Sequence, residues 1–537
     1  MALPPLASPL GIIAGASPHR ILRRAERILE HIARRRWLAV LLVVFFALGA
    51  RAVALALLPI PVPVIPDEFS YILGGETLAM GQLANPPHPM WRFFETTHVN
   101  MHPAYASKYP PAQAMFLALG IRVFGHPWYG VWLSMGLLCG AVCWMTQAWL
   151  PPKYAVIAGV VTALQIGITS YWINSYWGGA VAALGGALAI GALPRLAREP
   201  GAEGAVAAAL AIFLLANSRP FEGTVLIALL AVALLCWMRR RGNLPQLGRM
   251  TVIAPLLTVI ALTAAWTAYY DWKTTGNLLL LPYVVNSREY HWSSPFWVFP
   301  AATPPSRFRD TAMQNVWEWD HDLHMKSRRN PLHIFAVVGL TPYYDGLKKA
   351  FLLPILLAGT LVSAPRARLA LLLLGVFCLF LLTEQAVVPH YAAPGFGLLA
   401  LLVMFGFQVL RTMRLRGVAV GLPLVTMILI SIFGISANDV AKAHLAPSEP
   451  PALVFRAATL EQLNHTESRH LVMVRYAAKH PYHEEHVYNG PDIDAQKVVW
   501  ALDRGISEDR ALFAYYPDRK IWLYQPDSGS LQPWVDP

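Results

Sequence analysis

The sequence predicts an α-helical polytopic membrane protein with about 11–13 transmembrane helices and a small C-terminal α/β domain. The chain of 537 residues is 56% hydrophobic and only 14% charged, whereas soluble globular domains carry roughly 25% charged residues. Runs of about 20 apolar residues, each long enough to cross a bilayer as a helix, recur along most of the sequence. These runs are too continuous for the alternating strands of a membrane barrel.

The net charge of +12 comes from basic residues that cluster between the apolar runs. This placement is typical of loops that set membrane topology, so the charge gives no reason to expect nucleic acid as a partner. The segment 1–36 is expected to be a cytoplasmic basic tail, part of which suits an amphipathic helix lying on anionic membrane lipid. Its arginines near the first apolar run are Arg20, Arg23, Arg24, Arg27, Arg34, Arg35 and Arg36.

Apolar runs lie near residues 37–58, 112–125, 128–149, 154–170, 178–193, 205–218, 222–238, 250–270, 346–363, 367–383, 391–410 and 417–436. If all of them crossed the membrane, the basic stretches 239–249 and 411–416 would face outward, against the positive-inside rule. The run 112–125 is short and follows Pro110-Pro111. We therefore expect it to be a juxtamembrane or re-entrant helix, which leaves about eleven crossings and places all the basic loops inside.

This topology predicts a multi-pass plasma membrane protein, such as one of a bacterial inner membrane, with a cytoplasmic N-terminus and an extracytoplasmic C-terminus. A transmembrane domain is expected over 37–436, with a first outer loop at 60–111 and a long outer loop at 271–345. Charges return in 437–537, where "HLVMVRY", "KVVWALD" and "KIWLYQP" are typical of short buried strands. That segment is predicted to be a small extracytoplasmic α/β domain.

The cysteines and histidines give little reason to expect a cofactor. All four cysteines fall in apolar runs, so no disulfide framework is predicted. His88, His98 and His102 with Glu95 could ligate a divalent cation, but Pro103 and the absence of an HxxxE or HExxH pattern favour histidines without a metal. No metal site is predicted, and a divalent cation stays open as a possible cofactor.

The stretch "IPDEFSY" places Asp67 and Glu68 directly after the first apolar run. A Pro-Asp-Glu sequence suits a helix N-terminus, where acidic side chains are favourable. The same two carboxylates could also serve in catalysis, and the two roles do not exclude each other.

Several motifs in order resemble the C-type glycosyltransferase superfamily, in particular its protein O-mannosyltransferases and the transferases that add aminoarabinose to lipid A. The Asp-Glu pair is followed by "YILGGETLAMGQL" and then by "SKYPPAQAMFLALG", which is similar to a Lys-Pro-Pro-Leu-like motif with Tyr109 inserted after Lys108. "FLLANSRPFEG" resembles a helix ending in a basic residue and Pro. "VVPHYAAPGFG" resembles an Arg-Tyr-x-x-Pro helix start, with His390 where Arg is usual.

The resemblance implies transfer of a sugar from a polyprenyl-phosphate donor to a lipid, glycan or protein acceptor on the outer face, with inversion. Asp67 would be the general base and Glu68 would orient the acceptor or the base. Cations would stabilise the departing lipid phosphate, and the candidates to bind it are Lys108, Arg219, His390 and Tyr391. Further candidates for substrate binding are Tyr109, Glu95, His102, Asn174 and Glu222.

Structural explanations compete with these roles. Lys108 could extend along a helix end toward the interface, Arg219 could pair with Glu222, and the aromatics around Asn174 suit an interfacial belt. Two other functions also stay open. A lipid-linked sugar flippase or transporter would place ionisable residues and broken helices at mid-membrane, whereas a non-catalytic scaffold would present the C-terminal domain to a partner.

Overall fold

The computed structural model describes residues 18–309, 311–330, 352–360, 364–386, 388–445, 451–481 and 483–535. The expected helix at 346–363 is therefore described only over residues 352–360, and residues 1–17 of the tail and 331–345 of the long loop lie outside the described residues.

The described elements follow in chain order. They are α1 (Pro18–Arg34), α2 (Arg36–Ala54), α3 (Pro66–Ala79), η2 (Trp91–Phe93), β1 (Val99–Asn100), β2 (Ala106–Ser107), α4 (Ala112–Phe124), α5 (Trp128–Trp149), α6 (Pro152–Ile166), α7 (Ala180–Arg198), α8 (Ala202–Ala216), α9 (Pro220–Arg241), η3 (Leu244–Gly248), α10 (Met250–Thr275), α11 (Pro282–Glu289), α12 (Thr311–Arg329), α14 (Leu352–Gly359), α15 (Pro365–Leu381), η6 (Ala393–Gly395), α16 (Phe396–Thr412), β3 (Arg414–Leu415), β4 (Val418–Ala419), α17 (Gly421–Leu445), α18 (Pro451–Asn464), β5 (His470–Val474), β6 (Val498–Leu502), α19 (Ile506–Tyr515), β7 (Lys520–Gln525), η7 (Pro526–Ser528) and β8 (Ser530–Pro533).

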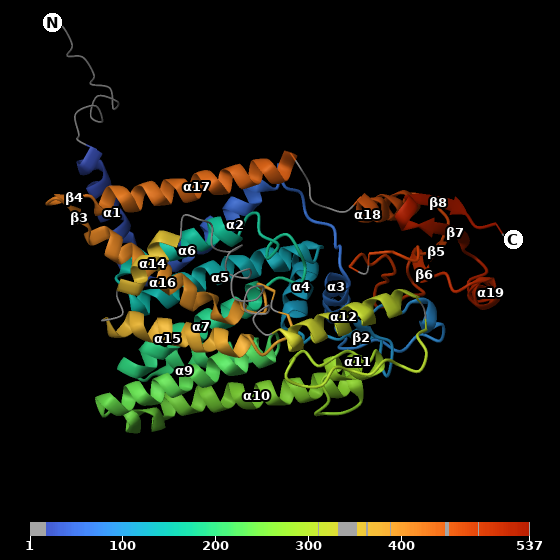
Figure 1. The fold of residues 1–537 in the computed structure, drawn as a ribbon, viewed down its shortest axis with the longest axis horizontal. Coiled ribbons are helices and arrows are strands. Elements are labelled where there is room, and N and C mark those ends of the chain that lie inside the picture. The colour runs from blue at the N-terminus through green and yellow to red at the C-terminus, as the bar shows by residue number, and fades with distance from the viewer. Residues whose placement is uncertain are drawn as a thin grey trace, which may run out of the picture.

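The apolar runs form a helical bundle, as predicted (Figure 1). Within the described ranges, 7 helices are long and apolar enough to cross a membrane, namely α2, α5, α7, α9, α10, α16 extended by η6, and α17. Three shorter apolar helices, α4, α6 and α8, accompany them. The chain is therefore a multi-pass membrane protein.

The bundle has a buried centre and an apolar outer surface. In α5 and α7, 78% and 89% of the apolar window is buried, whereas only 11% and 17% is buried in α10 and α17. Small residues let the central helices approach closely, since a Cβ on Gly191 of α7 would lie 2.4 Å from the Trp144 ring of α5. Leu262 and Phe433 on the peripheral helices are each 62% exposed, which suits contact with lipid.

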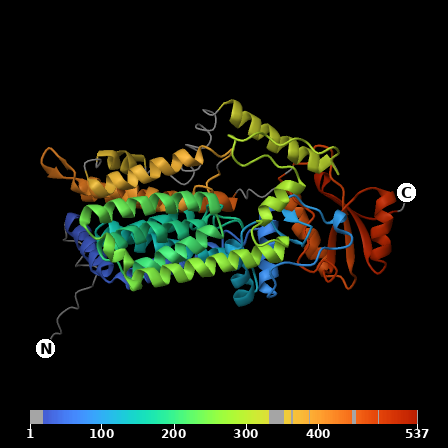
Figure 2. The same cartoon turned by 90° about the horizontal axis from the view of Figure 1, so that it is seen from below.

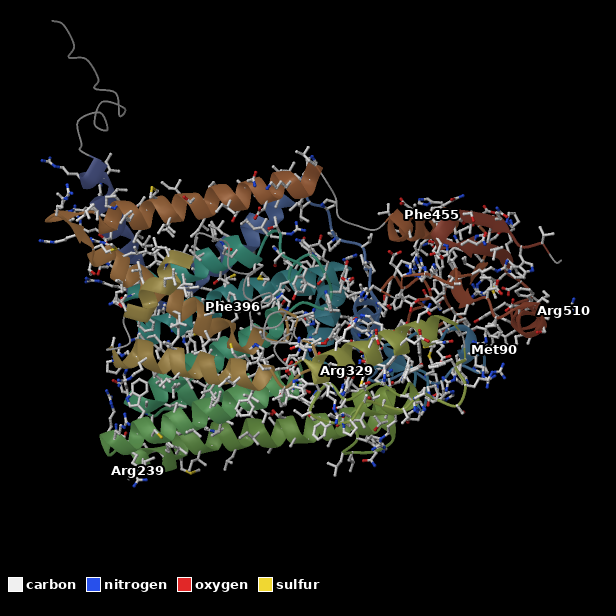
Figure 3. All side chains as sticks on the ribbon, viewed as in Figure 1. Met90, Arg239, Arg329, Phe396, Phe455 and Arg510 are labelled. Carbon is white, nitrogen blue, oxygen red and sulfur yellow. The ribbon has the colours of Figure 1, made fainter. Side chains whose placement is uncertain are left out.

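The predicted cytoplasmic loops lie together at one end, which we call the arginine-rich end. Glu26 of α1 binds both Lys153, at the start of α6, and Arg411, near the end of α16. Arg366 at the start of α15 donates to the Trp149 carbonyl at the end of α5. Figure 3 shows Arg239, at the end of α9, far from Met90 and Arg510.

At the opposite end, α3 and α4 run across the bundle and not along it (Figures 1 and 2). The 13 residues of α4 span only about 20 Å at 1.5 Å per residue. They pack closely on α3, since a Cβ on Gly75 would lie 2.7 Å from the Leu117 Cβ. The short helix expected at 112–125 is therefore present as α4, and α3 of the first outer loop packs beside it.

The C-terminal segment forms the predicted small α/β unit. Its sheet has the order β6-β5-β7-β8, with the first three strands parallel and β8 antiparallel. The three predicted strand sequences correspond to β5, β6 and β7. We call this end of the molecule the sheet end.

The sheet also packs against the first outer loop. One hydrophobic cluster contains Leu73, Phe94 and Tyr105 from the loop together with Leu471 and Val499 from the sheet. Figure 2 shows the sheet beside the segments of that loop. The C-terminal unit therefore helps to hold in place the loop that carries Asp67.

Candidate functional site

Glu68 caps the helix that carries the acidic pair. The helix α3 begins at Pro66, a residue suited to the first helical position, and has both acids in its first turn. The buried Glu68 carboxylate accepts hydrogen bonds from the backbone N–H groups of Val64 at 2.7 Å, Ile65 at 3.2 Å and Tyr176 at 3.0 Å. Burial raises the pKa of Glu68 to about 7, although these N–H groups oppose the shift. Glu68 thus organises the backbone at the helix N-terminus, as the Pro-Asp-Glu sequence predicted.

Asp67 points toward a different set of side chains. The Tyr109 hydroxyl donates to Asp67 Oδ1, and His98 Nδ1 lies 3.2 Å from Oδ2. Burial by itself raises the pKa of Asp67, but His98, Lys108 and the Tyr109 hydrogen bond outweigh it and hold the pKa well below its usual range. Asp67 therefore stays ionised at neutral pH.

Lys108 is a buried cation close to this carboxylate. Lys108 is only 6% exposed. Within the described part of the chain, its ammonium makes no ion pair or hydrogen bond. It instead lies over the rings of Tyr109, at 5.1 Å, and Tyr283, at 5.3 Å. Burial lowers the pKa of Lys108 to about 8, and the attraction of Asp67 limits this fall. Most molecules therefore keep the positive charge at pH 7.

Arg219 brings a second cation from the N-terminus of α9. Its guanidinium lies 4.2 Å from the Tyr391 ring centroid, and Nη1 is 3.9 Å from Glu222 Oε1. Burial tends to lower the pKa of Arg219, but Tyr71, Glu222 and Tyr391 raise it above its usual value. Arg219 also lowers the pKa of Lys108, which Asp67 raises. Asp67 and Arg219 thus both act electrostatically on Lys108, as expected if the three charges share one site.

His390 departs from its expected role as a cation. It is only 2% exposed, its Nδ1 lies 3.1 Å from the Tyr171 hydroxyl, and its ring centroid is 4.3 Å from that of Trp177. Burial, followed by repulsion from Arg219, holds the pKa of His390 well below its ordinary value. His390 is therefore neutral at pH 7 and can contribute hydrogen bonds but no charge.

Three of the further candidates have structural partners away from Asp67. Glu95 is buried and accepts from Arg309 and, at 3.1 Å, from the Tyr290 hydroxyl. Asn174 accepts from Arg51 at 2.8 Å and thereby ties the end of α2 to the segment before α7. His102 is exposed and lies edge-on to the Trp91 ring.

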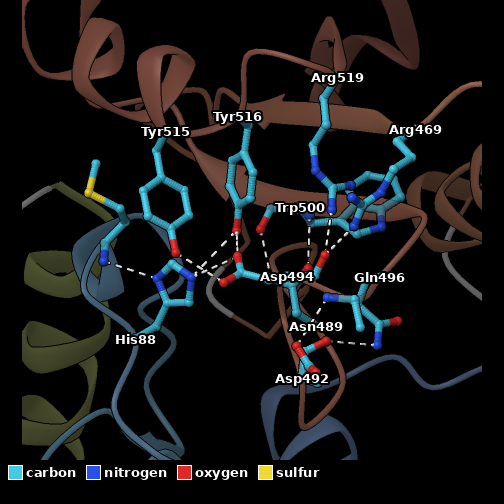
Figure 4. Close-up of polar contacts among 12 residues, drawn as sticks. His88, Arg469, Asn489, Asp492, Asp494, Gln496, Trp500, Tyr515, Tyr516 and Arg519 are labelled. Atoms are coloured by element: carbon cyan, nitrogen blue, oxygen red, sulfur yellow. Dashed lines mark hydrogen bonds and ion pairs between the residues drawn. The ribbon is translucent and has the colours of Figure 1, made fainter.

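Within the described residues, the histidines weighed as possible cation ligands do not come together in a metal site. His88 instead reaches the C-terminal unit, where its Nε2 lies 3.0 Å from Asp494 Oδ1, with the Tyr515 and Tyr516 hydroxyls also bonded to Asp494 (Figure 4). No group of three or more His, Cys, Asp or Glu residues able to hold a metal ion occurs among the described residues.

Sequence reasoning named Tyr109 and Lys108 but missed His98 and Tyr71 as neighbours in the site. His98 was considered only as a metal ligand, although it lies beside the carboxylate. Tyr71 stacks on Tyr109 with 4.4 Å between ring centroids, and it lies one helical turn after Asp67. That spacing was a signal available in the sequence. The approach of His98 depends on the path of the first outer loop, for which the sequence holds no simple pattern.

Comparisons with known proteins give structural neighbours only. Protein-family models and curated sequences give no match to this chain. An oligosaccharyltransferase from Archaeoglobus fulgidus in the apo form is similar at 12% identity and a TM-score of 0.49, covering 91% of this chain and 69% of that one. ArnT from Cupriavidus metallidurans is similar at 14% identity and a TM-score of 0.49 in the apo state, covering 90% of this chain and 93% of that one.

The same ArnT bound to undecaprenyl phosphate is similar at 13% identity and a TM-score of 0.48, covering 90% of each chain. These neighbours are an oligosaccharyltransferase and ArnT, and a likeness at this level of identity concerns the fold alone. At 12–14% identity these neighbours assign no role to any residue of this chain.

Proposed function

We propose that this protein is an integral-membrane glycosyltransferase that moves a sugar from a polyprenyl-phosphate donor to an acceptor hydroxyl at the outer face of the membrane, with inversion. The sheet end is the extracytoplasmic end, and the arginine-rich end is cytoplasmic. The gathering of the basic loops at one end supports this orientation, because positively charged loops are retained on the cytoplasmic side.

The observation that carries the proposal is Lys108. A buried ammonium without an ion pair within the described ranges costs stability. Such a cost is typical of a functional site, where the charged group binds a ligand of opposite charge. The charge of Arg219 lowers the pKa of Lys108, and a phosphate would relieve that repulsion.

Each charged side chain of the site would have a role in the transfer reaction. The acceptor oxygen attacks the anomeric carbon, the bond from that carbon to the phosphate oxygen breaks, and the polyprenyl phosphate leaves with the electron pair. Lys108 and Arg219 would stabilise the negative charge that develops on the leaving phosphate. The ionised carboxylate of Asp67, with His98 beside it and Lys108 nearby, would receive the proton of the acceptor hydroxyl.

A transporter or flippase is a weaker explanation of the same residues. It would require ionisable groups in the middle of the spans, whereas Arg51 lies in the last turn of α2 and donates to the Leu58 carbonyl and to Asn174. None of the three charged residues of the candidate site lies within a described spanning helix; they are Asp67, Lys108 and Arg219.

The proposal is tested by supplying radiolabelled polyprenyl-phosphate sugars to membranes that contain the wild-type chain or its Asp67→Asn variant. We expect label to become covalently attached to an acceptor only with the wild-type chain. Movement of an intact labelled donor across the membrane without transfer would support a flippase. Absence of both transfer and movement across a panel of donor sugars would contradict the proposal.

A further inference from the structure

We propose that the proton of the acceptor hydroxyl is taken by Nε2 of His98, and that Asp67 acts as the positioning residue that holds this imidazole. This inference rests on the proposed function and sharpens it, because the sequence indicated Asp67 itself as the base.

The hydrogen bonds determine which ring nitrogen can accept a proton. An ionised carboxylate only accepts hydrogen bonds, so Asp67 Oδ2, which lies 3.2 Å from His98 Nδ1, favours the tautomer with the hydrogen on Nδ1. The Tyr109 hydroxyl donates to Asp67, so its oxygen, 3.1 Å from Nδ1, must accept the hydrogen bond that Nδ1 donates. In the neutral ring, Nε2 must then carry the lone pair.

Nε2 is also the free nitrogen of this ring. Within the described part of the chain no hydrogen bond to Nε2 is present, and the His98 side chain is 21% exposed. Asp67 Oδ1, by contrast, already accepts a hydrogen bond from Tyr109, and Asp67 Oδ2 lies 3.2 Å from His98 Nδ1. An acceptor hydroxyl can therefore approach Nε2 without displacing a protein partner.

The backbone holds His98 in place. Its carbonyl accepts a hydrogen bond of 2.6 Å from the Ser70 hydroxyl of α3, and β1 begins at the next residue. Ser70 Oγ in turn lies 2.8 Å from the Ser107 hydroxyl on β2. The imidazole is thus fixed relative to Asp67 on α3 and to Lys108, which directly follows β2.

The charged and titratable groups around His98 come from several segments. They are Asp67 on α3, Lys108 and Tyr109 after β2, Asp320 on α12 and His483 in the loop between β5 and β6. Burial lowers the pKa of His98, Asp67 raises it, and Lys108 lowers it again, so that the pKa lies below its ordinary value of 6.5. The ring is therefore neutral at pH 7 and ready to accept a proton.

The step balances in atoms and charge. The acceptor O–H bond breaks, its proton moves to Nε2, and the oxygen electrons form the bond to the anomeric carbon. The bond between that carbon and the phosphate oxygen breaks toward the phosphate. The imidazolium, stabilised by the Asp67 carboxylate, later releases the proton to water.

The test measures the pH dependence of sugar transfer by purified wild-type chain and by His98→Asn in lipid nanodiscs. The Asn amide can still donate to Asp67 but offers no basic nitrogen. We expect transfer to fall by about 10²–10⁴-fold, the donor KM to stay within a few-fold, and the acidic limb of the profile to disappear. The matched control is His480→Asn, because His480 also faces a carboxylate through Nδ1, at 2.9 Å from Asp527, while its Nε2 is occupied by the Glu484 carbonyl.

Two results separate this inference from the proposed function. If the wild-type chain transfers sugar and His98→Asn keeps both the rate and the acidic limb, His98 is not the base and the proposed function stands. If no donor gives transfer with the wild-type chain, the proposed function itself fails. Equal losses of rate and of the acidic limb in His98→Asn and His480→Asn would overturn the assignment to Nε2.

Discussion

The two ends of the bundle use buried charge differently. At the arginine-rich end, Glu26 accepts from Arg411 at 2.9 and 2.8 Å and from Lys153 at 2.8 Å, so each charge in this cluster has a partner. At the sheet end, Lys108 is more deeply buried and makes no ion pair within the described ranges. A paired cluster joins helices, whereas a cation kept without a partner indicates a place for a ligand.

The largest expected effect is the loss of transfer in Asp67→Asn. The substitution keeps the size of the side chain but removes the charge that fixes the His98 tautomer, so we expect the rate of transfer to fall by about 10³–10⁴-fold. The initial rate with a radiolabelled donor measures this. Asp527→Asn is the control, since Asp527 also faces a histidine but lies in the C-terminal unit. Comparable activity in wild type and Asp67→Asn would remove the carboxylate from the mechanism.

Lys108→Met and Lys153→Met compare the two ends directly. Loss of the Lys108 charge should raise the donor KM by about 10–100-fold, as expected for a lost charge-assisted hydrogen bond. It should leave thermal stability unchanged or increased, because a desolvated charge is removed.

Lys153→Met should show the opposite pattern, with unchanged transfer and a stability loss of about 1 kcal/mol, since Glu26 loses a partner. Donor titrations and thermal melts of both variants measure the two effects. An unchanged donor KM in Lys108→Met would mean that this lysine does not contact the donor phosphate.

Arg219→Lys should have a smaller effect. A lysine keeps the charge but loses the planar fork that suits a phosphate and stacks on Tyr391. We expect the donor KM to rise by about 3–10-fold, with Arg411→Lys at the arginine-rich end as the control for the chemical change. If the two variants retain the same donor KM as wild type, the geometry of the Arg219 guanidinium has no part in donor binding.

The smallest effect concerns the pH dependence of stability through Glu68. Its pKa is raised to about 7 in the folded chain, above its ordinary value, so the folded state favours the protonated acid. This contribution to stability is present below the unfolded pKa and is lost as the pH rises through about 7. Thermal melts should show a larger fall in Tm between pH 6 and pH 8 for wild type than for Glu68→Gln. A pH dependence identical in both would show that Glu68 does not titrate in this range.

The sequence predicted the helices well because long apolar runs and basic loops follow directly from the cost of placing polar groups in lipid. The strands near 470, 498 and 520 could also be predicted, since buried β-branched residues mark them. The presence of Asp67, Lys108 and Arg219 in one place could be expected from the order of the motifs.

What could not be predicted were the contacts set by irregular backbone. His98, Glu95 and His102 come from one loop, yet only His98 lies beside Asp67. Similarly, the adjacent acids Asp67 and Glu68 diverge because successive residues on a helix point about 100° apart, so one faces the site and the other caps the helix. The neutral state of His390 depends on burial by aromatics from distant segments.

The most direct test of the central claim is the equilibrium binding of a radiolabelled polyprenyl phosphate to the purified chain in nanodiscs. The wild type and Lys153→Met should bind with the same Kd, and Lys108→Met should bind at least about tenfold more weakly. Equal Kd values for Lys108→Met and Lys153→Met would show that the unpaired lysine at the sheet end is not the place where the lipid phosphate binds.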